Sequence, residues 1–201
     1  MSEASTAAPT ATRRGRVAPI IVLAVAVAMG GLFWLLIGAK SGDGADSNYT
    51  PLLDKAAPAV KTTTLDGQTF DLQRRKGSWV VLNFFQSTCV PCVREHPELI
   101  AFAEQQADRG VYGAELYTVV SLGDPIDKVT EFFAANGGTW PILRDDDANI
   151  QVSFGVYKVP ETWIIDPDGR VVFRTIAQVT ADSLTRELGV QRSLYEQRVS
   201  G

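Results

Sequence analysis

The two cysteines of the chain, Cys89 and Cys92, are the residues whose types and spacing point most clearly to chemistry. They are the only cysteines among 201 residues, and Val90 and Pro91 separate them. A Cys-x-x-Cys pair placed between a strand and a helix is a redox arrangement. The unpaired N–H groups and partial positive charge of a helix N-terminus favour the thiolate at Cys89. The short spacing then lets Cys92 attack a mixed disulfide on Cys89.

Other readings of a cysteine pair fit this sequence less well. A structural disulfide between residues so close in sequence would close a very short loop and stabilise the fold little. A structural zinc site needs four ligands, which one histidine and two cysteines cannot supply. The pair therefore predicts thiol–disulfide exchange, and two inert buried thiols remain the alternative.

The elements needed to position the pair can be read on either side of it. The apolar run Trp79–Phe85 predicts a buried strand. From Cys89 to about Arg109 we expect a helix, kinked at Pro97. The other predicted elements are a hairpin (60–63 and 69–72), a strand (115–121), a helix capped by Asp124 that runs to about 135, a short strand (141–144), a short helix (149–154), a second hairpin (162–166 and 170–175) and a helix from Thr180 to Leu188. This order predicts an α/β fold in which helices cover both faces of a mixed sheet with an antiparallel edge hairpin.

A long apolar segment precedes these elements. It runs from Val17 to Ala39, 23 residues without a charge, which is long enough to span a bilayer. Three arginines lie within the first 16 residues, so the positive-inside rule predicts a cytoplasmic N-terminus and an extracytoplasmic catalytic domain. A cleaved signal peptide is the alternative, but its apolar region would be shorter and would end in a better cleavage site.

Composition divides the chain into five parts. We expect a cytoplasmic tail (1–16), a single transmembrane anchor (17–39), a polar linker (40–50), a folded domain (51–190) and a C-terminal tail (191–201). Residues 41–201 carry 15 Lys and Arg against 22 Asp and Glu. This negative balance argues against nucleic acid as a partner and against anionic-lipid binding by the soluble part.

Two motifs in this order resemble the membrane-anchored TlpA-like thiol–disulfide reductases, which include the cytochrome c biogenesis thioredoxins. The first is Cys-x-Pro-Cys followed by Glu95 and Pro97, and the second lies at residues 155–169. The resemblance covers about residues 51–190. It implies a thioredoxin fold with a central mixed sheet flanked by helices and an N-terminal β-hairpin extension. We expect the chemistry to need no cofactor and no metal.

The resemblance also implies roles for residues far from the cysteines in sequence. Pro160 would be a cis-proline facing the pair, and it would expose the Val159 backbone to a substrate chain. Glu161 would lie near the thiols, where a carboxylate raises the pKa of Cys92 and takes its proton. The alternatives are a trans turn proline and a solvated surface acid. Asn83 stands where general thioredoxins carry a buried Asp, which shifts any proton transfer toward Glu161.

Three further positions carry weaker signals. His96, the single histidine, falls one helical turn after Cys92 and could modulate a thiol pKa, but we expect a partly exposed helix residue. The acidic run Asp145–Asp147 is interpreted as the start of a helix or a solvated loop rather than a calcium site. Thr88 departs from the Trp that many family members place before the first Cys, which leaves the shape of the groove open.

The sequence thus predicts an extracytoplasmic, membrane-anchored thiol–disulfide oxidoreductase. Cys89 attacks a substrate disulfide, Cys92 resolves the mixed disulfide, and a membrane electron-donor thiol protein reduces the pair again. By resemblance, apocytochrome c thiols awaiting haem are the leading substrate among exported proteins. A disulfide-forming oxidase is the alternative within the same class. A copper-binding module fits less well, because His96 is too near the cysteines in sequence to be its third ligand. A peroxidase fits less well, because the Pro expected before Thr88 is missing.

Overall fold

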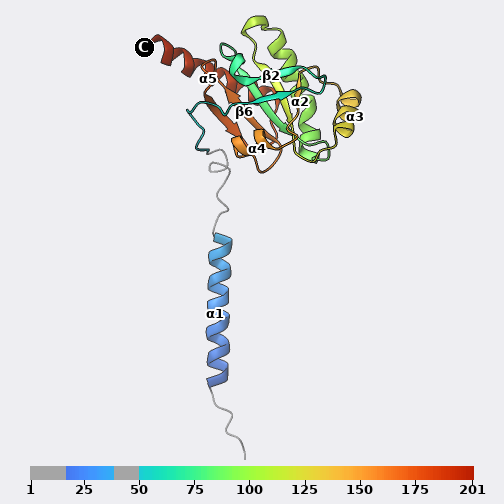
Figure 1. Cartoon of the computed structure of the whole chain (residues 1–201). Coiled ribbons are helices and arrows are strands. Elements are labelled where there is room, and N and C mark those ends of the chain that lie inside the picture. Colours follow the sequence, from blue (N-terminus) through green and yellow to red (C-terminus); the bar gives the residue numbers. More distant parts are fainter. Residues whose placement is uncertain (1–16, 39–49) are drawn as a thin grey trace, which may run out of the picture. The chain divides into compact units, whose positions relative to one another are not determined.

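The computed structural model of the chain describes residues 17–38 and 50–201, with side chains of the first segment described at residues 19–31. The chain divides into two compact units, one that holds helix α1 (Val17–Gly38) and one that holds the domain (Figure 1). In the part of the chain that the structure describes, no helix has the length and apolar character needed to cross a membrane. The predicted cytoplasmic tail and nearly all of the predicted linker lie outside the described residues.

A five-stranded mixed sheet in the order β5-β4-β3-β6-β7 forms the centre of the domain. β3 (Val80–Phe85) pairs in parallel with β4 (Glu115–Val120), which pairs in parallel with β5 (Ile142–Leu143). On its other side β3 pairs antiparallel with β6 (Glu161–Ile165), and β6 pairs antiparallel with β7 (Val171–Thr175). All six side chains of β3 are buried, as its nearly continuous apolar sequence predicts. The predicted mixed sheet with an edge hairpin is confirmed.

Helices cover both faces of this sheet (Figure 1). One core cluster joins β3 to α2, α3 and α5, and the other joins it to α4 and the N-terminal hairpin of β1 and β2. The helices are α2 (Val90–Ala107), α3 (Ile126–Asn136), α4 (Asn149–Phe154) and α5 (Ala181–Ser200). The hairpin strands and the two 3₁₀ helices are β1 (Lys61–Thr63), β2 (Thr69–Asp71), η1 (Leu72–Arg75) and η2 (Gly110–Tyr112). Alternating residues of β3 therefore face two separate cores.

The start of α3 differs from the prediction that Asp124 caps it. The N-cap is Pro125, and it makes no side-chain capping bond. The Asp124 carboxylate instead accepts hydrogen bonds from the backbone N–H of Ser87 at 2.6 Å and from the Ser87 hydroxyl at 2.5 Å. The capping prediction is wrong because this carboxylate holds the loop that leads to Cys89.

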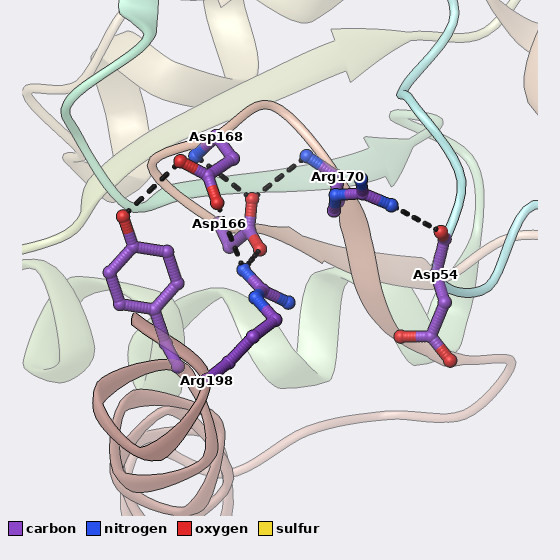
Figure 2. A network of polar contacts seen from close by, with 6 residues as sticks. Asp54, Asp166, Asp168, Arg170 and Arg198 are labelled. Carbon is purple, nitrogen blue, oxygen red and sulfur yellow. Dashed lines mark hydrogen bonds and ion pairs between the residues drawn. The ribbon is translucent and has the colours of Figure 1, made fainter. Parts of the chain in front are cut away.

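The C-terminal helix is longer than predicted. The sequence predicts a helix from Thr180 to Leu188. α5 instead continues through Gly189 to Ser200. Figure 2 shows how its last turn is held: Arg198 contacts Asp166 at 2.5 Å and Asp168 at 3.1 Å in the β6–β7 turn. Residues 191–200, which we expected to form a tail, thus continue α5.

Candidate active site

Cys89 and Cys92 lie at the N-terminus of α2, just after the end of β3, and a disulfide joins them. Cys89 is the N-cap residue, and its Sγ accepts a hydrogen bond from the backbone N–H of Cys92 at 3.2 Å. Cys89 is partly exposed, whereas Cys92 is fully buried. A substrate disulfide can therefore reach Cys89 and not Cys92. This difference supports the predicted division into an attacking and a resolving cysteine.

The loop before β6 faces the reactive sulfur. The Val159–Pro160 peptide bond is cis, as the resemblance implied. The carbonyl oxygen of Val159 lies 3.7 Å from the Sγ of Cys89. The structure thus brings Val159, Pro160 and the cysteine pair together, and substrate binding by this backbone stays a prediction.

A buried network of hydrogen-bonded polar groups lies on the inner face of α2, one turn after Cys92. Its centre is Glu95, which is 1 % exposed. Asn83 donates from Nδ2 to Glu95 Oε1 at 2.8 Å and to Thr162 Oγ1 at 3.2 Å. The backbone N–H of Val179 donates to Glu95 Oε2 at 3.1 Å. These hydrogen bonds therefore connect β3, α2, β6 and the residue before the N-cap of α5 around one carboxyl group.

Burial controls the protonation of this carboxyl. Desolvation raises the pKa of Glu95 to about 7, although the hydrogen bonds from Asn83 and Val179 act to lower it. A group with such a pKa exchanges its proton readily near neutral pH. Residues three apart on a helix share a face, so Glu95 and Cys92 are neighbours on α2. Sequence reasoning used Glu95 only as part of a motif, and its helical spacing from Cys92 was the signal that could have found it.

Glu161 lies on the other face of the sheet. In the antiparallel pair it stands opposite Phe84, one position along from Asn83. Directly opposed residues share a face, so the Glu161 side chain points away from Asn83 and Glu95. It is fully buried and its Oε1 accepts from Nε of Arg174 at 2.7 Å. Burial raises the pKa of Glu161, and Arg174 acts to lower it. Glu161 is therefore not a solvated surface acid, and it is not part of the hydrogen-bond network around Glu95 on the α2 face.

His96 is buried, so the expectation of a partly exposed side chain is wrong. It is 2 % exposed, and its Nε2 lies 2.9 Å from the carbonyl oxygen of Gly137. The reason is a set of aromatic rings whose centroids lie 4.8–5.5 Å from the imidazole: Phe132, Phe133 and Trp140. Desolvation in this setting lowers the pKa of His96 and favours the neutral ring.

The acidic run before α4 acts as a helix start, as predicted. The Asp145 carboxylate accepts hydrogen bonds from the backbone N–H groups of Ile150 and Gln151, both at 2.9 Å. Among residues 17–38 and 50–201, no group of three or more His, Cys, Asp or Glu side chains is placed to hold a metal ion.

Comparisons with known proteins bear on the fold and on the chemistry. The profile of the AhpC/TSA family matches residues 53–174. The thiol:disulfide interchange protein HelX of Rhodobacter capsulatus is 32% identical over 142 residues, which cover 69% of this chain and 76% of that protein. The thiol:disulfide interchange protein DsbE homolog of Paracoccus denitrificans is 32% identical over 176 residues, or 85% of this chain and 91% of that protein.

A solved structure supports the fold. The thioredoxin domain of a thiol-disulfide oxidoreductase from Bacteroides vulgatus matches with a TM-score of 0.60 at 20% identity, and the match covers 70% of this chain and 97% of that chain. The implied thioredoxin fold is therefore confirmed for the domain.

Proposed function

This chain belongs to the AhpC/TSA family and, within it, to the TlpA-like thiol–disulfide oxidoreductases of the cytochrome c biogenesis type, and from this premise we propose that it reduces disulfides of exported proteins, with apocytochrome c as the substrate class, whose disulfide it reduces to the thiols that await haem. One observation carries the proposal. A partly exposed Cys89 and a buried Cys92 share a helix N-terminus beside the Val159 carbonyl. This is the geometry that two-step thiol–disulfide exchange requires.

In the first step the Cys89 thiolate attacks one sulfur of the substrate disulfide. A Cys89–substrate disulfide forms, and the second substrate sulfur leaves as a thiolate. The helix N-terminus stabilises the negative charge on Cys89, and the N–H of Cys92 points at its sulfur. The backbone at Val159 and Pro160 pairs with the substrate chain and holds its disulfide against Cys89.

In the second step Cys92 resolves the mixed disulfide. Its thiol gives a proton to the Glu95 carboxylate, and the resulting thiolate attacks the Sγ of Cys89. The Cys89–Cys92 disulfide forms and the other substrate sulfur leaves, so the substrate has gained two electrons. A membrane electron-donor thiol protein then returns two electrons to the pair.

We assign the proton transfer to Glu95 and a positioning role to Glu161. The pKa of about 7 and the place of Glu95 on the Cys92 face of α2 support the first assignment. Glu161 directly follows Pro160, and its bond to Arg174 ties the start of β6 to β7. Glu161 thus acts through the backbone of the cis-proline loop rather than on a proton of Cys92.

We further propose that the protein is anchored in the cell membrane, with the N-terminus in the cytoplasm and the catalytic domain outside. The support comes from the uncharged segment 17–39 and from the arginines before it. An extracytoplasmic site is where protein disulfides persist unless they are actively reduced.

The redox potential of the Cys89–Cys92 pair tests the direction of electron flow. We expect the full-length protein, equilibrated with dithiothreitol or glutathione buffers, to show a potential below about −200 mV, in the range of reducing thioredoxin-fold proteins. Mass spectrometry after alkylation reads the ratio of thiol to disulfide. A potential well above this value would assign the protein to the disulfide-forming oxidases.

Trapping tests the division of roles between the two cysteines. Cys92→Ser should accumulate mixed disulfides between Cys89 and exported proteins in cells, because the resolving thiol is gone. Cys89→Ser is the matched control and should accumulate none, since Cys92 is buried. Equal trapping by both variants would contradict the assignment.

A further inference from the structure

A hollow opens at the end of β3 that is remote from the cysteine pair. It holds about 250 Å³ and lies beside Trp79, the residue before β3. Cys89 lies beyond the other end of this strand, whose six residues span roughly 20 Å. The hollow is lined by three aromatic side chains, one arginine and one proline that matter for its chemistry: Trp79, Tyr112, Tyr195, Arg192 and Pro167. The thiol chemistry uses none of these residues.

Aromatic rings form the walls of this hollow. The rings of Trp79 and Tyr195 meet edge to face, with centroids 5.7 Å apart. The Tyr195 hydroxyl donates to Asp168 at 3.3 Å, which fixes the ring. Tyr112 is 77 % exposed, as is expected of a side chain at the mouth of a site. These surfaces suit a flat apolar ligand.

Arg192 supplies a cation that no carboxylate of the described residues pairs with. Its Nε and Nη2 atoms are shielded from solvent and have no hydrogen-bond partner among the described residues. Its guanidinium lies 5.9 Å from the centre of the Trp79 ring. Burial lowers the pKa of Arg192, and the nearby positive charge of Arg109 lowers it further. Among the residues that the structure describes, this guanidinium therefore lacks the anion that ordinarily accompanies one.

The described acidic residues near Arg192 form no ion pair with it. Asp166 and Asp168 already pair with Arg198, six residues after Arg192 on α5 (Figure 2). Glu196 lines the hollow and attracts Arg192, but it makes no ion pair with it within 4.0 Å. An anion in the hollow would therefore pair with a guanidinium that none of these carboxylates holds.

We propose that this hollow binds a small aromatic carboxylate. Arg192 pairs with the carboxylate, and the rings of Trp79 and Tyr195 pack on the body of the ligand. The planar guanidinium matches a carboxylate through two parallel hydrogen bonds. Since the site lies at the far end of β3, binding here is independent of the reductase proposal.

Benzoate is the probe that tests the site on the full-length protein. We expect it to shift the indole N–H signal of Trp79 saturably in ¹H–¹⁵N NMR spectra, with assignment by Trp79→Phe. Arg192→Gln should weaken this binding at least tenfold. Arg186→Gln is the matched control, because it removes an exposed arginine of the same helix that does not line the hollow, and it should leave binding unchanged.

Two further probes separate the parts of the ligand. Benzyl alcohol keeps the ring without the charge and acetate keeps the charge without the ring, so each should bind at least tenfold more weakly than benzoate. Glu196→Gln should tighten benzoate binding, because a competing carboxylate is removed. Arg192→Lys keeps the charge without the fork, and it should bind benzoate more weakly than the original protein but more tightly than Arg192→Gln.

Clear results would overturn the proposal. These results are the absence of saturable benzoate shifts at Trp79, benzoate binding by Arg192→Gln as tight as that of the original protein, or binding of benzyl alcohol as tight as that of benzoate. Arg192→Gln should retain the wild-type rate of disulfide reduction, which shows that the variant is folded. If it loses that rate together with benzoate binding, Arg192→Lys decides the question, and binding of benzoate by that variant no tighter than its binding of benzyl alcohol would contradict an anion site.

Discussion

Among single residues, Glu95 is the group on which the second chemical step depends. In its carboxylate form it takes the proton of Cys92, so the resolving rate should rise with pH through about 7, the pKa that burial gives this group. We expect Glu95→Gln to slow closure of the Cys89–Cys92 disulfide by about 10²-fold or more, the usual size of general-base effects. Rapid mixing of the reduced protein with oxidised glutathione, quenched by alkylation at several pH values, measures this rate.

The pH profile separates proton transfer from a purely structural effect. Glu95→Gln should lose the rise near pH 7, whereas a variant that only loosens the site would keep it. Glu104→Gln is the control on the same helix, because Glu104 is exposed and should leave rate and profile unchanged. A Glu95→Gln profile that still rises through pH 7 would remove Glu95 from the mechanism.

The same carboxyl makes stability depend on pH. Its pKa is 4.5 in the unfolded chain and about 7 in the folded protein, so the folded state holds the proton more tightly. Stability therefore falls as pH rises from about 4.5 to 7, and the cost of ionisation, about 3 kcal/mol, is fully present above pH 7. Glu95→Gln avoids this cost, and the unpartnered Oδ1 of Asn83 can accept from the new amide if the Asn83 amide flips.

Urea unfolding of the oxidised protein tests this linkage. At pH 8 we expect Glu95→Gln to be more stable than the original protein by about 1–3 kcal/mol, and this advantage should vanish toward pH 4.5. An advantage of the same size at both pH values would show that ionisation of Glu95 is not its source.

Sequence reasoning located the cysteines and the cis-proline because each belongs to a short motif with its own local signal. Glu95 and Asn83 lie in the same stretch of sequence, but their partnership depends on how α2 packs on β3. Glu161 illustrates the opposite case. Its closeness to the motif suggested a catalytic role, yet strand register turns its side chain to the other face of the sheet. Which face a strand residue occupies follows from pairing that a single motif does not reveal.

At the scale of secondary structure elements, the loop between β3 and α2 is held from outside. Asp124, at 6 % exposure, accepts both hydrogen bonds that Ser87 donates to it, across 37 residues of sequence. We expect Asp124→Ala to destabilise the domain by about 1–3 kcal/mol, because the Ser87 donors lose their acceptor. Thermal or urea unfolding measures this change.

The exposed Asp127 provides the control for this loop. Asp127→Ala removes a carboxylate from the first turn of α3 and should cost only a few tenths of a kcal/mol. Asp124→Ala should also speed alkylation of reduced Cys89, since the loop before it is freed. Equal stability of the two alanine variants would mean that Asp124 does not hold this loop.

The elements that were predicted well are those with strong local patterns. The expected helix at 149–154 and the expected strands around β3, β4, β6 and β7 agree with the structure within two residues. The end of α5 was missed because Gly189 looks like a stop in isolation. Its continuation is stabilised by contacts to Trp79 and to the β6–β7 turn, which are remote in sequence.

At the scale of the whole molecule, β3 separates two sites, the cysteine pair and the proposed ligand-binding hollow. Its C-terminal end leads to the disulfide, and its N-terminal end leads to the hollow beside Trp79. Substitutions at one of these two sites should therefore leave the function of the other unaffected. The two sites share no side chains and lie farther apart than the range over which effects of substitutions usually couple.

The proposed anchor determines where the whole protein is located. Replacing residues 1–39 with a cleavable signal peptide should release the domain from the membrane fraction while leaving its redox potential unchanged, because no uncharged span of bilayer length remains. The released form should accumulate oxidised in cells, since a donor within the membrane then meets it less often. Fractionation and alkylation of intact cells measure both effects. If the original protein fractionates as soluble, or if Cys89 resists a membrane-impermeant alkylating reagent while the domain is reduced, the proposed anchor and orientation are wrong.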